Sequence, residues 1–200
     1  MLRIENKVIH VVDGAVDLPL VEEIFEWAVA SQRLGWRYGD VADAKYSTNP
    51  FWGATVLSEE RHGTEDVHRI QDTPEIVQRV WSRLEKGLRP FQFSIRDIFV
   101  NGQTYGIENA IHTDCPHGEE GWYTVLAYLN PKWHVDWGGE TVFYNKTRTD
   151  IVYAVVPRPG RIVFFDARFD HWGRAPTRNT QDLRITMAFC LTRKPDSPAP

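Results

Sequence analysis

Two segments in the first ninety residues place apolar side chains at helical spacing. In the first, Leu20, Ile24 and Ala28 recur four residues apart, and Asp17 and Pro19 are typical of a helix start. This pattern predicts a helix over about 18–32. A second helix is predicted from Thr73-Pro74 to about Gly87, and its apolar stripe contains Ile76, Val77, Val80, Trp81, Leu84 and Leu88. We expect both stripes to pack against a sheet.

From Phe91 onward the pattern changes to short β-branched and aromatic runs separated by turn residues such as Asn101-Gly102 and Pro159-Gly160. The runs lie at 91–100, 105–112, 122–130, 141–144, 151–156, 161–165, 171–174 and 183–191. They predict a mainly β protein, a barrel or jelly roll that the N-terminal helices support from one outer side. Segment 36–72, rich in Gly, Asp, Ser and Asn, is predicted to form long loops near the mouth of a site.

The length and composition indicate one domain. The chain has 200 residues, of which 42% are hydrophobic and 12% aromatic, enough for a substantial core. We expect a single domain over 1–200, with a helical part at about 1–90, a barrel at about 91–194 and a frayed tail at 195–200. Nothing in the sequence sets the oligomeric state.

The charge, the hydropathy and the cysteine content limit the expected partners and the expected compartment of the protein. The net charge of -4 gives no general attraction to nucleic acid or to anionic membranes. No apolar run approaches the length of a membrane span, and the first thirty residues lack the pattern of a secretion signal. The two cysteines, Cys115 and Cys190, are too few for a disulfide framework, and we interpret them as ordinary thiols. We expect a cytoplasmic protein.

Three residues distant in sequence form a candidate metal site. His112 and Asp114 stand two apart, so on a β-strand both side chains point to the same face. His171 begins another strand-like run, and a rolled sheet can bring the two runs together. Two imidazoles and one carboxylate are the ligand set of the non-haem Fe(II) oxygenases, which leaves three coordination positions open.

Two other histidines compete for this role. His134-Val135-Asp136 repeats the same spelling, but it lies between Asn130-Pro131 and Gly138-Gly139, where turn residues make a continuous strand unfavourable. We assign it to a loop. His117 follows Pro116 in loop-like sequence and is a weaker ligand candidate.

Arg184 and Thr186 form a candidate anion clamp. They stand two apart on an apolar strand and share one face, while Leu183 and Ile185 use the other. A guanidinium inside a barrel needs an anion, because an unpaired buried charge is costly. A dicarboxylate ligand or a carboxylate of the protein would satisfy it, and the residue itself does not decide between them.

With these residues placed, the chain resembles the Fe(II)/2-oxoglutarate-dependent dioxygenases, in particular their prolyl-4-hydroxylase-like branch. The resemblance covers roughly Tyr105 to Leu191 and says nothing about the substrate. Its ordered motifs are His112-x-Asp114, Thr124, Tyr128-Leu129-Asn130, Trp133, Gly138-Gly139-Glu140-Thr141-x-Phe143, Pro159-Gly160-Arg161 before Phe164-Phe165, His171 and Arg184-x-Thr186. The spacing between His171 and Arg184 is longer than is common in the family.

The resemblance implies a double-stranded β-helix that uses Fe(II), 2-oxoglutarate and O2, with ascorbate as a possible reductant. It implies that His112, Asp114 and His171 bind the iron. It further implies that Arg184 holds the C5 carboxylate of 2-oxoglutarate, assisted by Thr186 and the Tyr128 hydroxyl. The expected reaction releases succinate and CO2 and hydroxylates a C–H bond. Asp114 favours hydroxylation over chlorination, because the related halogenases lack a carboxylate at that position.

Two alternatives stay open at this stage. One is a cupin-type metalloenzyme that does not use 2-oxoglutarate, and the other is a noncatalytic binding module on the same barrel. The prime substrate is an organic molecule of unknown identity, either a small molecule or a protein residue. Aromatic and basic residues near the expected loops are the only substrate clues, and several of them are expected to serve packing or solvation: Phe51, Trp52, Trp133, Trp137, Trp172, Arg168 and Arg174.

Overall fold

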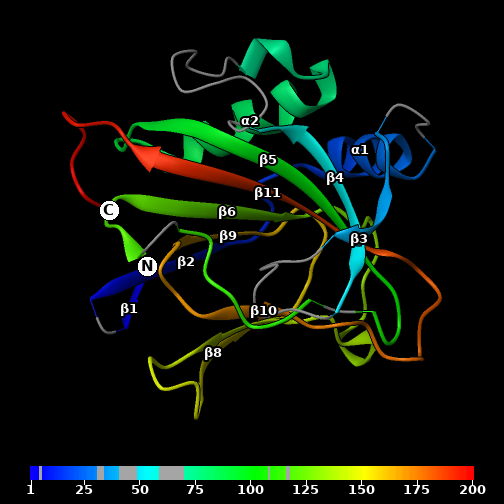
Figure 1. Cartoon of the computed structure of the whole chain (residues 1–200). Coiled ribbons are helices and arrows are strands. Elements are labelled where there is room, and N and C mark those ends of the chain that lie inside the picture. The colour runs from blue at the N-terminus through cyan, green and yellow to red at the C-terminus, as the bar shows by residue number, and fades with distance from the viewer. Residues whose placement is uncertain (5, 31–33, 41–48, 59–69, 108, 116–117) are drawn as a thin grey trace.

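The fold is that of a computed structural model, which describes residues 1–4, 6–30, 34–40, 49–58, 70–107, 109–115 and 118–200. Within these ranges the chain forms two α-helices and eleven strands, with short 3-10 turns η2 (Ile70–Asp72) and η4 (Val135–Trp137). The strands build two sheets that face each other, and both helices lie on the far side of the larger sheet (Figure 1).

The larger sheet has eight strands in the order β1-β2-β9-β6-β11-β5-β4-β3. Neighbouring strands are antiparallel throughout. Their bounds are β1 Leu2–Ile4, β2 Lys7–Val12, β3 Arg37–Asp40, β4 Phe51–Leu57, β5 Phe93–Gln103, β6 Trp122–Tyr128, β9 Ile162–Asp166 and β11 Arg184–Arg193. The smaller sheet contains β10 His171–Gly173, β7 Thr141–Tyr144 and β8 Ile151–Val155, in that order. This arrangement confirms the predicted double-stranded β-helix.

The helices α1 (Leu18–Ala30) and α2 (Glu75–Leu88) form where the hydrophobic pattern predicts them. Asp17 accepts a hydrogen bond from the backbone N–H of Leu20 at 3.2 Å, as expected of a capping residue. The predicted apolar stripes are buried against the larger sheet in one core cluster. From β11, Ile185, Met187 and Phe189 enter this helix-side cluster. The alternate residues of β11 therefore point between the two sheets.

A second cluster fills part of the space between the sheets. Phe143 from β7 and Phe165 from β9 meet edge to face, with ring centroids 5.0 Å apart. Tyr128 from β6 and Phe169 are also buried in this cluster. Beside this cluster, the inner residues of β5, β6 and β11 line a cavity, which Phe165 also borders.

Two expectations about strands were wrong, and two strands were missed. The described residues of 105–112 do not form a continuous strand, because a turn closes at Thr104 to Ile107 and Gly106 has a positive φ of 76°. Segment 36–72 contains strands as well as loops, since β4 pairs with β5 and β3 pairs with β4. The N-terminal strands β1 and β2 were not predicted, and β2 extends the larger sheet by pairing with β9.

A tight contact joins the N-terminal segment to the barrel at Gly160. Its carbonyl accepts a hydrogen bond from Val16 N–H at 3.1 Å, and its own N–H bonds to Tyr128 O at 3.2 Å. Gly160 has a φ of +67°, and a Cβ there would overlap the carbonyl oxygen of Val16. Only glycine fits this junction without strain.

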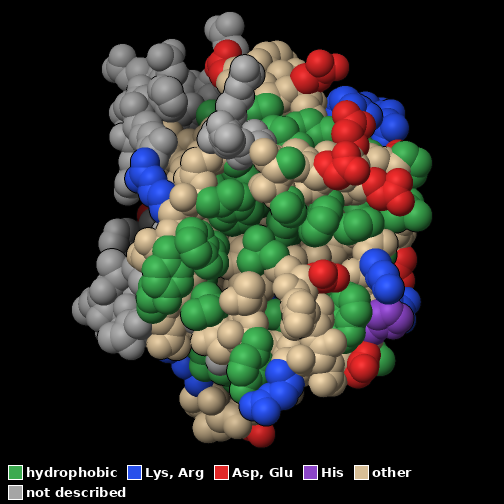
Figure 2. Space-filling model, turned by 90° about the vertical axis from the view of Figure 1, so that its right-hand side faces the viewer, with side chains coloured by type: hydrophobic (Ala, Val, Ile, Leu, Met, Phe, Trp, Pro, Cys, Tyr) green, Lys and Arg blue, Asp and Glu red, His purple; other side chains and the backbone are tan. Residues whose placement is uncertain are grey.

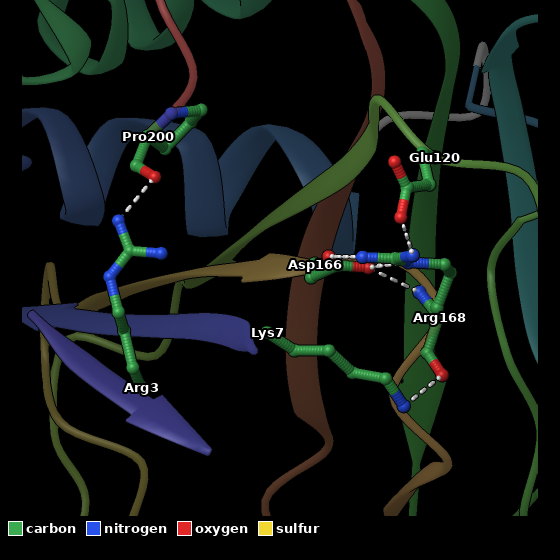
Figure 3. Close-up of polar contacts among 6 residues, drawn as sticks. All are labelled: Arg3, Lys7, Glu120, Asp166, Arg168 and Pro200. Carbon is green, nitrogen blue, oxygen red and sulfur yellow. Dashed lines mark hydrogen bonds and ion pairs between the residues drawn. The ribbon is translucent and has the colours of Figure 1, made fainter. Parts of the chain in front are cut away.

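Polar contacts hold the C-terminal tail, for which we predicted fraying. Ser197 Oγ accepts a hydrogen bond from Gln92 N–H at 2.7 Å, and Arg3 Nη2 donates to Pro200 O at 2.8 Å (Figure 3). On the face that Figure 2 shows, hydrophobic side chains gather across the middle, and Lys and Arg side chains are scattered. No helix in the described ranges is both long and apolar enough to cross a bilayer.

Candidate metal centre and cosubstrate pocket

His112, Asp114 and His171 converge on one point of the barrel. One potential ligand atom from each residue lies within 4.8 Å of the other two. Asp114 Oδ1 is 3.2 Å from His112 Nε2, and Asp114 Oδ2 is 3.5 Å from His171 Nε2. Two backbone hydrogen bonds of 3.0 and 2.9 Å between His112 and His171 place the imidazoles side by side. An isolated bridge, and not the continuous strand we expected, therefore aligns His112 with β10.

Backbone carbonyls orient both imidazoles. His112 Nδ1 lies 2.9 Å from Ala110 O, and His171 Nδ1 lies 3.0 Å from Phe169 O. A carbonyl can only accept, so each Nδ1 carries a proton, and Nε2 is the ring nitrogen that can bind a metal when it is unprotonated. This outer layer of hydrogen bonds is typical of histidines that bind metals.

Asp114 is held in the same way. Thr124 on β6 donates a hydrogen bond to Asp114 Oδ2 at 2.7 Å, and Asp114 N–H bonds to Ala167 O at 3.0 Å. Burial acts to raise the pKa of Asp114, but the imidazoles of His171 and His112 outweigh it, and the pKa lies below its usual range. Burial lowers the pKa of His171. These shifts favour the ionised carboxylate of Asp114 and the neutral imidazole of His171, which are the forms that bind a metal.

The donor set fits Fe(II). Two ring nitrogens and one carboxylate oxygen lie close together, and they match the facial arrangement in which the remaining coordination positions stay open to ligands. Within the described residues no other group of three such side chains comes together.

Arg184, at the start of β11, is buried in the same cavity and has only neutral hydrogen-bond partners. Its Nε donates to Gly139 O at 2.7 Å, Nη1 to Gln103 Oε1 at 2.7 Å and Nη2 to Thr141 Oγ1 at 3.1 Å. No carboxylate of the described chain forms an ion pair with it. A guanidinium has five N–H donors, so these three bonds leave two for an anion.

Thr186 and Tyr128 stand close to Arg184. Thr186 lines the cavity with Arg184, as the strand alternation predicts. The Tyr128 hydroxyl lies 2.7 Å from Thr141 Oγ1 and 3.4 Å from Val155 O, and the Arg184 guanidinium carbon lies 5.5 Å from the centre of the Tyr128 ring. Burial raises the pKa of Tyr128, so its hydroxyl stays protonated at neutral pH. Tyr128 is thus linked to Arg184 through the Thr141 hydroxyl, but it is not among the residues that line the cavity.

One cavity connects the cluster of His112, Asp114 and His171 with Arg184. Its wall includes His112, Asp114 and His171 at one end and Arg184 and Thr186 at the other, around about 60 Å³ of space. A second compartment of about 280 Å³ adjoins it on the side of His112 and Asp114. A ligand that joins the cluster to the guanidinium would therefore occupy the first compartment and leave the second available.

The competing residues lie elsewhere. His134 precedes the 3-10 turn η4, and its ring packs on Trp137 with centroids 4.8 Å apart, as a loop assignment predicts. His117 lies outside the described residues. Arg168 is engaged by Asp166 and Glu120 (Figure 3). The two cysteines are free thiols.

The sequence pattern missed several cavity residues. Gln103 and Asn101 were overlooked because the β5 run was expected to end at Val100, whereas alternation continued three residues further would have placed both on the inner face. Phe51 lines the cavity from β4, not from a loop. Nothing in the sequence indicates that Asn109 lines the cavity, because its position depends on the turn before His112.

Two facing sheets that bring two imidazoles, one carboxylate and a buried guanidinium to one cavity define the class of non-haem iron oxygenases built on a double-stranded β-helix. Residues 100–191 match the family model of the 2OG-Fe(II) oxygenase superfamily. The chain thus carries an Fe(II)/2-oxoglutarate-dependent oxygenase domain with a prolyl-hydroxylase-like fold, and it is an enzyme that uses Fe(II), 2-oxoglutarate and O2. No curated protein matches the sequence.

Solved structures share this fold at low sequence identity. A prolyl hydroxylase from Trichoplax adhaerens, in complex with a hypoxia inducible factor peptide, is 18% identical with a TM-score of 0.60, over 92% of this chain and 83% of that one. The viral collagen prolyl hydroxylase of Paramecium Bursaria Chlorella virus-1 is 14% identical with a TM-score of 0.60, over 92% and 94%. The carbocyclase SnoK from nogalamycin biosynthesis is 13% identical with a TM-score of 0.62, over 93% and 79%.

Proposed function

We propose that His112, Asp114 and His171 bind the iron, and that Arg184 and Thr186, supported by Tyr128, hold the C5 carboxylate of 2-oxoglutarate. The observation that carries the proposal is the shared cavity. It joins the cluster, whose ligand atoms lie within 4.8 Å, to a buried guanidinium with two donors left for an anion. We assign this site to a single domain over 1–200.

The proposed reaction is hydroxylation of a C–H bond in an organic substrate. When bound, Fe(II), 2-oxoglutarate and O2 supply the oxidative decarboxylation to succinate and CO2 that delivers one oxygen atom to the substrate. The chain supplies orientation and a dry cavity. Thr124 fixes the Asp114 carboxylate, the carbonyls of Ala110 and Phe169 fix the imidazole planes, and Arg184 fixes the far end of the cosubstrate.

The match to the 2OG-Fe(II) oxygenase superfamily and the site itself argue against the two alternatives from the sequence. A cupin-type enzyme without 2-oxoglutarate has no use for a buried guanidinium that lacks a carboxylate partner among the described residues. A noncatalytic binding module would not need all three potential metal ligands, yet His112, Asp114 and His171 are all present and close together. The substrate is proposed to be a small molecule or a protein residue; one structural neighbour is bound to a peptide and another is named a carbocyclase.

Succinate formation tests the metal ligands. Purified protein with Fe(II) and ascorbate is expected to convert 2-oxoglutarate to succinate slowly without added substrate. His112→Ala and His171→Ala are expected to abolish this turnover, because each removes one of three ligands. His134→Ala is the matched control and is expected to retain it, since His134 packs on Trp137 away from the cluster. Equal loss in all three variants would refute the ligand assignment.

A further inference from the structure

The second compartment, of about 280 Å³, has walls suited to a small neutral ligand. It lies against His112 and Asp114, and its walls come from the inner faces of β5 and β11 and from the turn that carries Asn109. It shares Phe51, Asn101 and Asn109 with the cosubstrate compartment. A molecule bound here therefore lies beside the proposed iron ligands.

Asn109 places an unpaired amide oxygen in the wall of this compartment. Its Oδ1 is shielded from solvent and has no hydrogen-bond partner in the described structure. Buried polar atoms of folded proteins are nearly always paired, and one that is not weakens the fold. A partner from a bound ligand explains why such a side chain stands at a cavity. The Asn torsion next to the amide is broad, so the group can turn either end to a ligand.

The remaining wall residues restrict the kind of ligand. Phe51 and Phe99 supply aromatic surface, and Ala188 leaves room beside them. Asp97 and Asp114 are acidic, and none of the described wall residues is Lys or Arg. The described wall thus offers no basic side chain to pair with an anion, whereas its aromatic surface accommodates a flat neutral group. Asn101 on β5 adds a second carboxamide to the wall.

We propose that the substrate is a small organic molecule with a neutral carboxamide, and that Asn109 determines this specificity. A carboxamide presents N–H and C=O on one edge, so it can pair with the C=O and N–H of the Asn109 side chain. The body of the substrate lies against Phe51 and Phe99, with the carboxamide at Asn109. This inference rests on the proposed function, because it assigns a ligand to the compartment beside the proposed iron ligands.

Benzamide and acetophenone test the proposal, because they have the same shape and differ by the N–H donor. Each is titrated calorimetrically into protein that holds Fe(II) and 2-oxoglutarate under anaerobic conditions. Wild-type protein is expected to bind benzamide about tenfold more tightly than acetophenone. Asn109→Leu is expected to weaken benzamide binding by about tenfold and to remove the preference.

Thermal stability separates a ligand-binding role from a structural one. Asn109→Leu removes an unpaired buried acceptor at nearly constant volume, so the Tm is expected to rise by about 2–4 °C. Asn130→Leu is the matched control. The Asn130 amide donates to Leu183 O and accepts from Ile185 N–H, both at 2.8 Å, so its replacement is expected to lower the Tm. A residue retained for structure would behave like Asn130.

Several results would overturn the proposal. They are equal binding of the two probes to wild-type protein, no binding of benzamide, unchanged benzamide binding in Asn109→Leu, or a lower Tm in that variant. Binding of the blocked peptide N-acetylglycine methylamide without binding of benzamide would also overturn it, because the amide would then belong to a peptide. Succinate formation by wild-type protein tests the proposed function separately, so the two failures can be told apart.

Discussion

At the scale of single residues, the neutral surroundings of Arg184 decide what the cavity can bind. Gln103 is buried and joins two elements, because its Oε1 accepts from Arg184 and its Nε2 donates to Gly173 O at 2.8 Å. The amide fixes the guanidinium without neutralising it. A carboxylate in the same place would satisfy the arginine permanently, and 2-oxoglutarate would have to compete with it.

Gln103→Glu is therefore expected to weaken 2-oxoglutarate binding by at least about tenfold, because an internal ion pair replaces the one with the cosubstrate. The measurement is an anaerobic titration of the Fe(II) protein with 2-oxoglutarate, followed by the visible absorption band of the chelate. Gln71→Glu makes the same change on the exposed turn η2 and is expected to bind like wild type. Wild-type affinity in Gln103→Glu would contradict this role of the neutral amide.

Much of the candidate site could be predicted from residue types and spacing. The His112-x-Asp114 pair, His171 and the Arg184-x-Thr186 pair are encoded by short intervals and by strand alternation, and the structure brings all five to one cavity. The tautomers of the imidazoles could not be predicted, because they depend on the carbonyls of Ala110 and Phe169. Gln103 and Asn109 escaped prediction because their neighbours come from distant segments.

At the scale of elements, the local hydrophobic pattern predicted the helices and most barrel strands, but it did not predict the edge strands of the larger sheet. The spacing of Leu20, Ile24 and Ala28 is local and was sufficient for α1. β1 and β3 are short strands at the two edges of the larger sheet, and their pairing depends on neighbours rather than on their own pattern. The turn at Gly106 interrupts a run that alternation alone predicts to be a strand.

Gly160 is the element junction that tolerates a side chain least. Gly160→Ala is expected to lower the free energy of unfolding by at least about 2 kcal/mol, because a left-handed backbone and an overlap with Val16 O act together. Gly87→Ala is the control. Gly87 lies within α2 with open space around it, and alanine there is expected to add about 0.5–1 kcal/mol. Urea denaturation measures both, and equal effects would contradict the assignment of strain to Gly160.

At the scale of the whole molecule, the fold and the cofactors are linked through stability. The cluster of His112, Asp114 and His171 joins the turn before β6 to β10, and Arg184 joins β11 to β5 and β7. Ligands that bind across these elements stabilise the folded state, by about 2.7 kcal/mol for a ligand at one hundred times its Kd.

Fe(II) and 2-oxoglutarate at such concentrations are each expected to raise the Tm by about 5–10 °C under anaerobic conditions, as measured by differential scanning fluorimetry. In His171→Ala the metal is expected to give no shift. In Arg184→Ala the shift from the metal is expected to remain, and the further shift from 2-oxoglutarate is expected to disappear. A full 2-oxoglutarate shift in Arg184→Ala would show that the cosubstrate is held elsewhere.

The division of β5 and β11 into two faces has a consequence for how this enzyme can change. Ile98, Val100, Met187 and Phe189 sustain the helix-backed core, while Phe99, Asn101, Ala188 and Cys190, alternating with them, border the chamber. Alternate residues of the same strands thus have separate roles: one set maintains the core, and the other set can change what the second compartment binds. A library that randomises only the residues facing the second compartment would sample new substrates while leaving the core of the barrel unchanged.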